Sequence, residues 1–413
     1  MKVEWKEFKG QVLHDFPYPL KNRKCPHYAL VSVTASGSCV HRCPMCYARV
    51  YPWSIDDRIV IYKNLPQKID EELSRAKIMP PLYLSQVSDV LQPVREVREI
   101  TCEVIKVILK HNVSFHIVTK NAEGALELIQ KIPSLIKYPF WYLAMTIEST
   151  PEKQKITSPF ASKIESRLRA LKILHKQGIM VSARTDPCIL GLLGKNEILW
   201  LIEKIRQTGV KHIVSSTGFF NRTSMARLLL AIKESRFASL ASRVAHIYEF
   251  CEDRINSYRV PTSQEWAGKR FWAPVELRKK FHRWLRREAE SRSMTYAICL
   301  ELPRSYDSPE LPHCEGCPNN YVHIKRNGKF YPVDECFGDC MRSCPDRNKP
   351  PCGKPILLTQ YPYKSTTLHL SKTSKEINIQ YLRKLALSAP PLAVGMKALW
   401  SARRAGQKAF FMI

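Results

Sequence analysis

Short apolar segments alternate with amphipathic segments along the first half of the chain. Their pattern predicts six buried strands, at residues 28–35, 81–88, 113–120, 140–149, 178–185 and 210–217. Helical periodicity falls between them, near residues 66–76, 97–111, 122–132, 162–177 and 195–208. Strands that alternate with helices predict an α/β fold with six βα units, either an open doubly wound parallel sheet or a partial barrel. In both architectures, ligands bind beyond the carboxyl ends of the strands.

The second half of the chain is organised differently. We expect a helical stretch from about 264 to 293, a strand at 294–303, and a hairpin within 321–336 that turns at Asn327-Gly328. Four parts follow: an N-terminal extension (1–27), a core with flanking helices (28–304), a small cysteine-rich domain (305–353) and a basic tail (354–413). The tail holds ten Lys or Arg residues against one Glu, and we expect it to be partly ordered.

Length and composition indicate the size of the domains and the cellular compartment that we expect for this chain. The chain has 413 residues, enough for a large domain and a smaller one. Its N-terminal segment lacks the apolar centre of a signal peptide, and no apolar run is long enough to cross a bilayer. We therefore expect a cytoplasmic protein with no membrane partner. The fourteen cysteines are not expected to form disulfides in that compartment, and those that cluster are expected to bind metal.

The net charge of +28 has two interpretations. It is either a feature of solubility or the sign of an anionic partner, most simply nucleic acid. Basic residues are dense at 278–293 and in the tail. The helix at 278–293 either contacts phosphates or presents a solvated basic face.

Three thiols lie in one loop directly after the first strand. Cys39, Cys43 and Cys46 are spaced C-x3-C-x2-C. A closed zinc site takes four ligands, whereas an iron–sulfur cluster held by three thiolates keeps one iron open for a substrate or cofactor. A zinc site that adds His41 as the fourth ligand is the alternative.

This spacing after the first strand of a βα repeat, with Tyr47 directly after the last cysteine, resembles the radical SAM superfamily. The resemblance implies a partial (β/α)6 barrel and a 4Fe-4S cluster on the three cysteines. It also implies that S-adenosylmethionine chelates the open iron and is reductively cleaved to a 5′-deoxyadenosyl radical, which abstracts hydrogen from the substrate. An electron donor such as ferredoxin or flavodoxin is then required.

Further motifs resemble the spore photoproduct lyase-like branch over residues 28–235. They are "CYAR" at 46–49, "SDVLQPVRE" at 88–96 and "IVTK" at 117–120. One position departs from that pattern. Gln86 stands where the lyases carry a hydrogen-donating cysteine, and an amide cannot replace a thiol in that role. We therefore do not expect repair of spore photoproduct by that route.

Family position makes several polar residues at strand ends candidates for holding the cofactor. Arg184 would pair with the methionine carboxylate, and hydroxyl groups would bind the ribose. The alternative for each is a helix cap or ordinary polarity at a strand end. The loop at 188–197 loosely resembles the one that packs on adenine. The candidates are Ser88, Asp89, Thr119, Lys120, Arg184 and Ser215, with Ser216 beside the last.

A second group of cysteines partly resembles the auxiliary-cluster domains called SPASM and twitch. We expect one auxiliary 4Fe-4S cluster there, with a four-thiolate zinc site as the alternative. Isolated cysteines elsewhere are expected to be buried thiols: Cys25, Cys102, Cys188, Cys251 and Cys299. The candidate ligands of the second group are Cys314, Cys317, Cys336, Cys340, Cys344 and Cys352.

Three functions remain open at this point. The first is a radical SAM enzyme acting on nucleic acid, slightly favoured by the charge. The second is a radical SAM enzyme that modifies a peptide or protein, as SPASM-like segments imply. The third is a noncatalytic iron–sulfur or zinc binding protein. Steep salt dependence of binding would indicate the first, and absence of cofactor cleavage the third.

Overall fold

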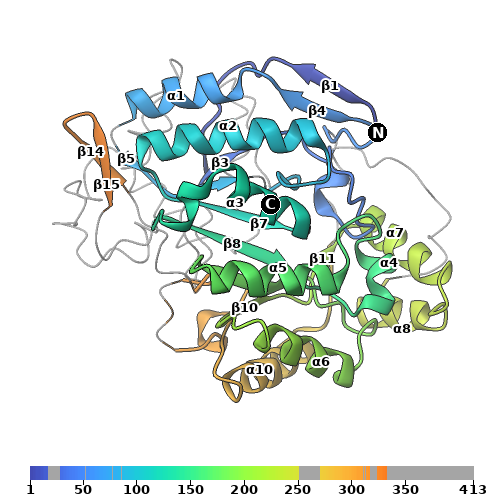
Figure 1. Ribbon diagram of the computed structural model, residues 1–413. Helices are drawn as coiled ribbons and strands as arrows, with labels where there is room; N and C mark the ends of the chain where they lie inside the picture. The colour runs from blue at the N-terminus through green and yellow to red at the C-terminus, as the bar shows by residue number, and fades with distance from the viewer. Residues whose placement is uncertain are drawn as a thin grey trace, which may run out of the picture.

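A computed structural model describes residues 1–16, 28–51, 53–76, 78–84, 86–250, 270–309, 311, 313–316 and 323–332. Its centre is an eight-stranded sheet in the order β13-β10-β9-β8-β7-β6-β3-β2 (Figure 1). Seven neighbouring strands are parallel, and β2 pairs antiparallel with β3 at one edge. The strands are β2 (His14–Phe16), β3 (Tyr28–Val31), β6 (Leu82–Leu84), β7 (Phe115–Thr119), β8 (Trp141–Thr146), β9 (Val181–Thr185), β10 (His212–Ser215) and β13 (Thr295–Ile298).

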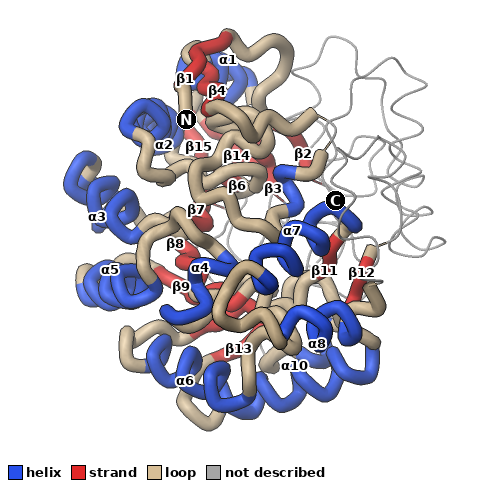
Figure 2. The backbone as a smooth tube through the Cα atoms, turned by 90° about the vertical axis from the view of Figure 1, so that its right-hand side faces the viewer, coloured by secondary structure: helices blue, strands red, loops and turns tan. Residues whose placement is uncertain are grey.

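All six predicted strands are present, and the α/β prediction is confirmed. The strand expected at 294–303 joins the sheet as β13, beside β10, so the parallel array has seven strands rather than six. Helices follow the outer face of the sheet (Figures 1 and 2). They are α1 (Leu65–Arg75), α2 (Arg95–His111), α3 (Ala122–Lys131), α5 (Ile164–Lys176), α6 (Lys195–Arg206) and α10 (Val275–Glu290).

Smaller elements complete the described chain. Strand β1 (Val3–Lys6) pairs with β4 (Ile59–Tyr62), which ties the N-terminal segment to the core. Within the described ranges, no helix has the length and apolarity needed to cross a membrane. The remaining helical elements are η1 (Tyr47–Arg49), η2 (Pro133–Ile136), η3 (Pro151–Lys153), α4 (Gln154–Thr157), α7 (Arg222–Lys233), α8 (Leu240–Ile247) and η5 (Arg304–Tyr306).

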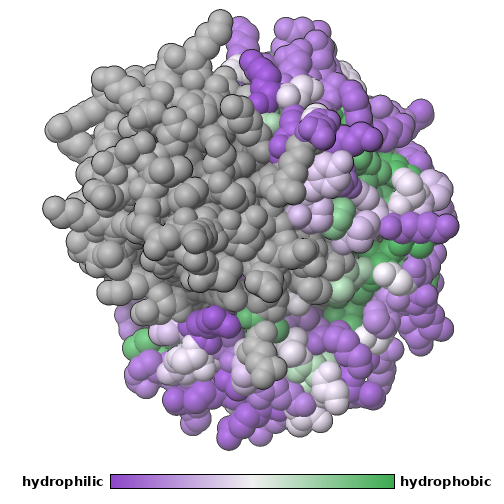
Figure 3. All heavy atoms as spheres, turned by 90° about the vertical axis from the view of Figure 1, so that its left-hand side faces the viewer, coloured by the Kyte–Doolittle hydropathy of each residue, from purple (hydrophilic) through white to green (hydrophobic). Residues whose placement is uncertain are grey.

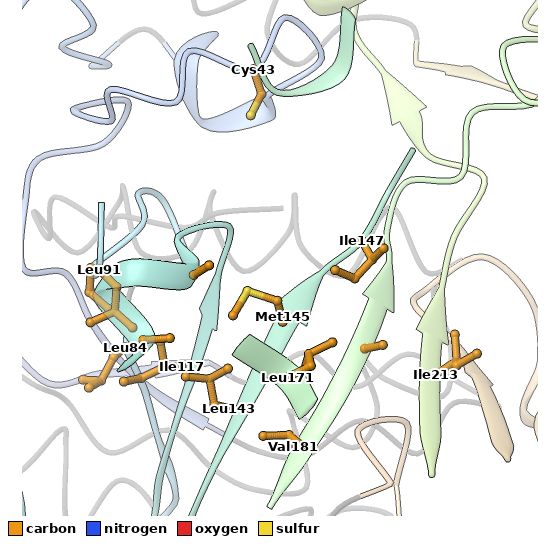
Figure 4. Close-up of a cluster of buried hydrophobic side chains, with 14 of the residues drawn as sticks. Cys43, Leu84, Leu91, Ile117, Leu143, Met145, Ile147, Leu171, Val181 and Ile213 are labelled. Atoms are coloured by element: carbon orange, nitrogen blue, oxygen red, sulfur yellow. The ribbon is translucent and has the colours of Figure 1, made fainter. Parts of the chain in front are cut away.

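The two faces of the sheet differ in chemistry. The outer face is aliphatic, and Leu171 of α5 packs there among Leu143, Met145 and Val181 (Figure 4). The opposite face, which we call the inner face, carries aromatic and polar side chains. On it the His116 ring stacks between Tyr83 and Tyr142, at centroid distances of 4.1 and 4.8 Å. Both faces are buried, which explains the nearly continuous apolar character of the strands.

The predicted helix at 264–293 is corrected at its beginning. Helix α10 begins at Val275, directly after Pro274, and residues 264–269 lie outside the described residues. Phe271–Trp272 instead forms strand β12, which pairs antiparallel with β11 (Phe219–Phe220). Pro274 is the N-cap residue, and a helix that continued upstream would place it in the interior, where its missing N–H and its ring disrupt the helical hydrogen bonds.

The predicted hairpin is confirmed as β14 (His323–Arg326) and β15 (Lys329–Pro332). Asn327 and Gly328 have φ of 50° and 79°, the left-handed pair that a two-residue hairpin turn requires. Strand β14 also pairs with β5 (Ile78–Met79), near the amino ends of the sheet strands (Figure 1). The boundary near 305 and the tail at 354–413 stay predictions, because most of 305–353 and the whole tail lie outside the described residues.

Candidate cofactor and metal site

The cysteine loop leaves β3 at the carboxyl edge of the sheet. Cys43 lies beyond the carboxyl ends of β8 and β9 (Figure 4). The loop is packed closely where it begins, at Gly37, whose N–H donates to the Val87 carbonyl at 3.2 Å. Gly37 has a φ of +77°, and a Cβ there would lie 2.0 Å from Ser54 Oγ. Any other residue would be strained and would clash, so this glycine sets the course of the loop.

Asp89 ties the cysteine loop to two neighbouring strands. Its buried carboxylate accepts hydrogen bonds from His41 Nε2 at 2.9 Å and from the Leu91 N–H at 2.8 Å. It also accepts from Thr119 Oγ1 at 2.9 Å and from the Lys120 N–H at 2.7 Å. Burial alone would raise the pKa of Asp89, but the contact with His41 and the two amides outweigh it, so the pKa is lowered. The carboxylate is therefore ionised and fully engaged within the chain.

Gln92 holds the loop on both sides of Cys39. Its Oε1 accepts the Val40 N–H at 2.9 Å, and its Nε2 donates to the Ser38 carbonyl at 3.0 Å. Gln92 is fully buried, so neither end of its amide competes with water. The stretch at 88–96, singled out as a motif, thus supplies two side chains that fix the cysteine loop. Sequence reasoning missed this role for Gln92, although the residue lies inside the motif.

A buried charge network lies beside Cys43. Glu148 accepts from Arg167 Nη1 at 2.8 Å and lies 3.1 Å from Lys120 Nζ. Burial would raise the pKa of Glu148, but the two cations hold it far below its usual range. Burial raises the pKa of Cys43 to about 12, against the opposing charge of Lys120. Glu148 and Arg167 were also missed; the only sequence signal was an acidic residue placed directly after the apolar strand.

Four candidate hydroxyls form hydrogen bonds with groups at the strand ends themselves. Ser88 Oγ accepts a hydrogen bond from Thr34 Oγ1 at 2.6 Å. Ser215 Oγ donates to the Thr185 carbonyl at 3.1 Å, and Ser216 Oγ donates to Asp186. Thr119 bonds Asp89 as described above. The roles of these residues toward a cofactor stay predictions, and their present contacts join adjacent strands.

Arg184 is paired with two carboxylates of this chain. Its Nη1 lies 2.7 and 3.0 Å from the two oxygens of Glu315, and its Nη2 lies 2.7 Å from Asp186. These contacts leave Arg184 buried on the inner face. The predicted pairing with a methionine carboxylate would therefore have to replace one of these partners. Of the predicted cofactor residues, Lys120 alone presents a side-chain cation next to the cysteine loop.

The three thiols of the loop are free cysteines in the structure. Cys43 is buried, and Cys39 and Cys46 are partly exposed. Within the described part of the chain, no three His, Cys, Asp or Glu side chains are already gathered as a metal site. His41 faces oxygen with both ring nitrogens, Asp89 at 2.9 Å and the Phe160 carbonyl at 3.3 Å. This geometry disfavours the zinc alternative in which His41 is the fourth ligand.

The second cysteine group begins on the inner face. Cys314 is buried, and its carbonyl accepts from His212 Nε2 at 3.0 Å. Glu315 makes the ion pair with Arg184, and a Cβ on Gly316 would lie 2.5 Å from the His212 ring. Of the isolated cysteines, Cys102 and Cys188 are buried as predicted, and Cys299 is partly buried. Outside the described residues lie Cys25, Cys251, Cys317, Cys336, Cys340, Cys344 and Cys352.

Two curated proteins are similar to this chain in sequence. One is a radical SAM Nalpha-GlyT isomerase of Pseudomonas phage M6, 20% identical over 358 residues, which are 81% of this chain and 70% of that protein. The other is an uncharacterized protein of Methanocaldococcus jannaschii, 28% identical over 169 residues, which are 39% of this chain and 61% of that protein. No family model matches the chain.

Among the solved structures similar to this chain, two differ in the substrate class that their names state. A mutant of spore photoproduct lyase with bound AdoMet and dinucleoside spore photoproduct has a TM-score of 0.49 at 12% identity, covering 72% of this chain and 81% of that one. SuiB of Streptococcus suis, bound to its precursor peptide SuiA, has a TM-score of 0.34 at 9% identity, covering 46% and 39%. Such low similarity does not discriminate between substrates. The sequence relationship and the parallel α/β fold together show that the chain is related to radical SAM enzymes, as its cysteine loop predicted.

Proposed function

We propose that this chain is a radical SAM enzyme with a 4Fe-4S cluster on Cys39, Cys43 and Cys46. With S-adenosylmethionine bound, that cluster would supply a 5′-deoxyadenosyl radical by reductive cleavage. One observation carries the proposal above the others. A loop with three thiols leaves the first parallel strand at the carboxyl edge and is fixed there by buried side chains from the segment between β6 and α2.

The residues around the loop fit a three-thiolate cluster. His41 is engaged by oxygen on both nitrogens, so the loop offers three ligands and no fourth. Cys39 and Cys46 are partly exposed, which leaves them accessible to iron. Lys120 places a cation near Cys43, paired with Glu148 at 3.1 Å, and is our candidate to bind a carboxylate of the cofactor. Asp89 and Gln92 then act as positioning residues for the loop.

We propose a macromolecular substrate, nucleic acid in preference to a peptide. The net charge of +28 supports this choice, because a polycation attracts a phosphate backbone at long range. The alternative of a peptide or protein substrate is supported by the second cysteine group, which we propose to bind one auxiliary 4Fe-4S cluster or a zinc ion. Metal and sulfide analysis of the Cys336→Ala variant, beside Cys39→Ala, would separate the two sites.

The experiment that tests the proposal is cofactor cleavage. Protein is reconstituted anaerobically with iron and sulfide, dithionite and S-adenosylmethionine are added, and 5′-deoxyadenosine is measured by mass spectrometry. We expect product from the wild type and none above background from Cys39→Ala. The matched control is Cys102→Ala, which removes a buried thiol of α2 and should leave cleavage unchanged.

Two results would contradict the proposal. Cleavage that persists in Cys39→Ala would show that the three-cysteine assignment is wrong. A wild-type protein that holds its cluster yet yields no 5′-deoxyadenosine would indicate a noncatalytic iron–sulfur or zinc protein instead.

A further inference from the structure

Helix α10 carries more positive charge than its own acidic residues neutralise. It contains six Lys or Arg residues and three Glu residues, a net charge of +3. Each Glu already has a cation partner at 2.7–2.8 Å: Glu276 with Lys279, Glu288 with Arg292, and Glu290 with Arg286. Every acidic residue of the helix is therefore already in an ion pair, and none is left to neutralise the remaining cations.

Four cations of α10 are left without an acidic partner, and one of them, Arg278, donates to the backbone carbonyls of Ala273 and Glu301 instead. Lys280, Arg283 and Arg287 are exposed, and none forms an ion pair with an acidic residue in the described part of the chain. Their spacing of three and four residues places them on one side of the helix. With a rise of about 1.5 Å per residue they span about 10 Å, close to three phosphate steps along one strand of a duplex, at about 3.4 Å each.

Neighbouring elements extend this row of charges. Lys195, the exposed first residue of α6, places its Nζ 5.9 Å from the Trp284 ring, which lies between Lys280 and Arg287 in the sequence. Arg283 lies 5.9 Å from the ring of Tyr306 in η5. Helices α6 and α10 lie side by side at the lower edge of the molecule, where the surface is hydrophilic (Figures 1, 2 and 3).

The beginning of α10 is joined to the carboxyl edge of the sheet. Arg278 Nη1 donates to the Glu301 carbonyl at 2.9 Å, and the Glu301 carboxylate accepts the Gly218 N–H at 2.7 Å. Gly218 follows β10 at its carboxyl end. A polyanion that lies along α10 would therefore be led toward the same edge of the sheet that carries the cysteine loop.

We propose that this basic patch, defined as Lys195, Lys280, Arg283 and Arg287, binds backbone phosphates of a nucleic-acid substrate. The inference rests on the proposed function and adds a place where the substrate is held outside the reacting site. Phosphate contacts of this kind position a strand without reading its sequence. Removing water from an exposed cation costs less free energy than burying one. These residues therefore suit phosphate binding that depends on salt and not on sequence.

The chain itself offers a matched control on α5. Arg169, Lys172 and Lys176 are also exposed, have the same spacing, begin equally far from the start of their helix, and have no ion-pair partner among the described residues. They lack the additional cation and the aromatic rings that flank the α10 row. We would compare the triple variant K280Q/R283Q/R287Q with R169Q/K172Q/K176Q, because both lower the net charge by three.

The measurement is binding of a fluorescein-labelled 20-base-pair DNA duplex by anisotropy, from low to moderate salt. Each phosphate contact contributes about 0.9 to the magnitude of the slope of log K against log salt. The α10 variant loses up to three contacts, so we expect the magnitude of its slope to fall by about 2 to 3. We expect affinity at about 0.1 M salt to fall at least about tenfold. The α5 variant should bind within about twofold of the wild type, and both variants should keep basal 5′-deoxyadenosine formation.

Three results would overturn the inference. Equal losses in both variants would assign binding to diffuse charge. The wild type could also bind polyglutamate as tightly as it binds DNA, with the α10 variant losing the same affinity for both ligands. That result would assign the patch to an acidic polypeptide. A wild type that cleaves S-adenosylmethionine but shows no salt-dependent DNA binding would remove both the patch and the substrate class, while leaving the proposed radical SAM activity intact.

Discussion

The two cysteine-bearing regions are held in place in different ways. The loop with Cys39, Cys43 and Cys46 lies at the carboxyl edge and is fixed by neutral and charged hydrogen bonds from the motif at 88–96, which follows β6. The segment that begins at Cys314 is packed against the inner face and is fixed by an ion pair between Glu315 and Arg184, 131 residues apart in the sequence. The first region stays accessible, whereas the second begins as part of the core.

This difference indicates different roles, a reacting site for the first region and structural attachment to the core for the second. Gln92 holds the first loop through backbone groups on both sides of Cys39, and Asp89 holds it through the ring of His41. The Glu315 contact instead uses Arg184, a buried arginine of the inner face that also pairs with Asp186. Changes near the first loop should therefore alter cofactor chemistry, and changes at Glu315 should alter stability and metal content at the second region.

The largest effect is expected for Asp89→Ala. It leaves a buried His41 and Thr119 and two backbone amides without their acceptor, which should lower the free energy of unfolding by about 3 to 5 kcal/mol. The control is Asp70→Ala, whose carboxylate is 34% exposed and pairs with Lys110 and His111, and which should cost about 1 kcal/mol. Urea unfolding checks both variants. Equal costs would show that Asp89 does not hold the loop.

Glu315→Gln should cost less, about 2 kcal/mol, because Arg184 keeps Asp186 as a partner at 2.7 Å. Thermal unfolding and metal analysis would measure the change, with Glu165→Gln, an exposed acid of α5, as the control. We expect S-adenosylmethionine cleavage within about twofold of the wild type. A parallel loss of cleavage would mean that the two regions are coupled rather than independent.

The inner face should make stability depend on pH. Burial, helped by the charges of Arg184 and His313, holds the pKa of His116 well below its usual range. Below about pH 6.5 the unfolded chain protonates this histidine and the folded chain does not, so stability falls as the pH falls, by up to about 1.4 kcal/mol per unit. His116→Phe should remove this part of the slope. Identical pH profiles of unfolding would refute the assignment.

The smallest effect is expected for Gln92→Met. This variant keeps the volume of the side chain but removes the acceptor for the Val40 N–H and the donor to Ser38, at a cost of about 1 kcal/mol. Hydrogen exchange gives the sharper readout: the Val40 amide should exchange at least about tenfold faster, and that of Ile117 in β7 should not change. Unaltered exchange at Val40 would show that Gln92 is not needed to fix the loop.

Local patterns in the sequence were enough for the elements and for the place of the cysteine loop. Apolar strands of the right length, separated by helices, lead to a parallel sheet, and a loop after the first strand must then lie at its carboxyl edge. The hairpin followed from Asn327-Gly328, because these residues tolerate the left-handed backbone of a tight turn. The start of α10 was misplaced because helical composition continued upstream of Pro274, where β12 pairs with β11 instead.

By itself, then, the sequence determined the α/β order, the three-thiol loop and the excess of positive charge, because each depends on residues close together in the chain. Only the tertiary structure decided the use of the polar residues. In the structure Asp89 pairs with His41, Arg184 with Glu315, and Lys120 with Glu148. Each pairing depends on which strands become neighbours and in what register. A charged side chain buried at a strand end takes whichever partner the sheet brings to it, and no local pattern records that choice.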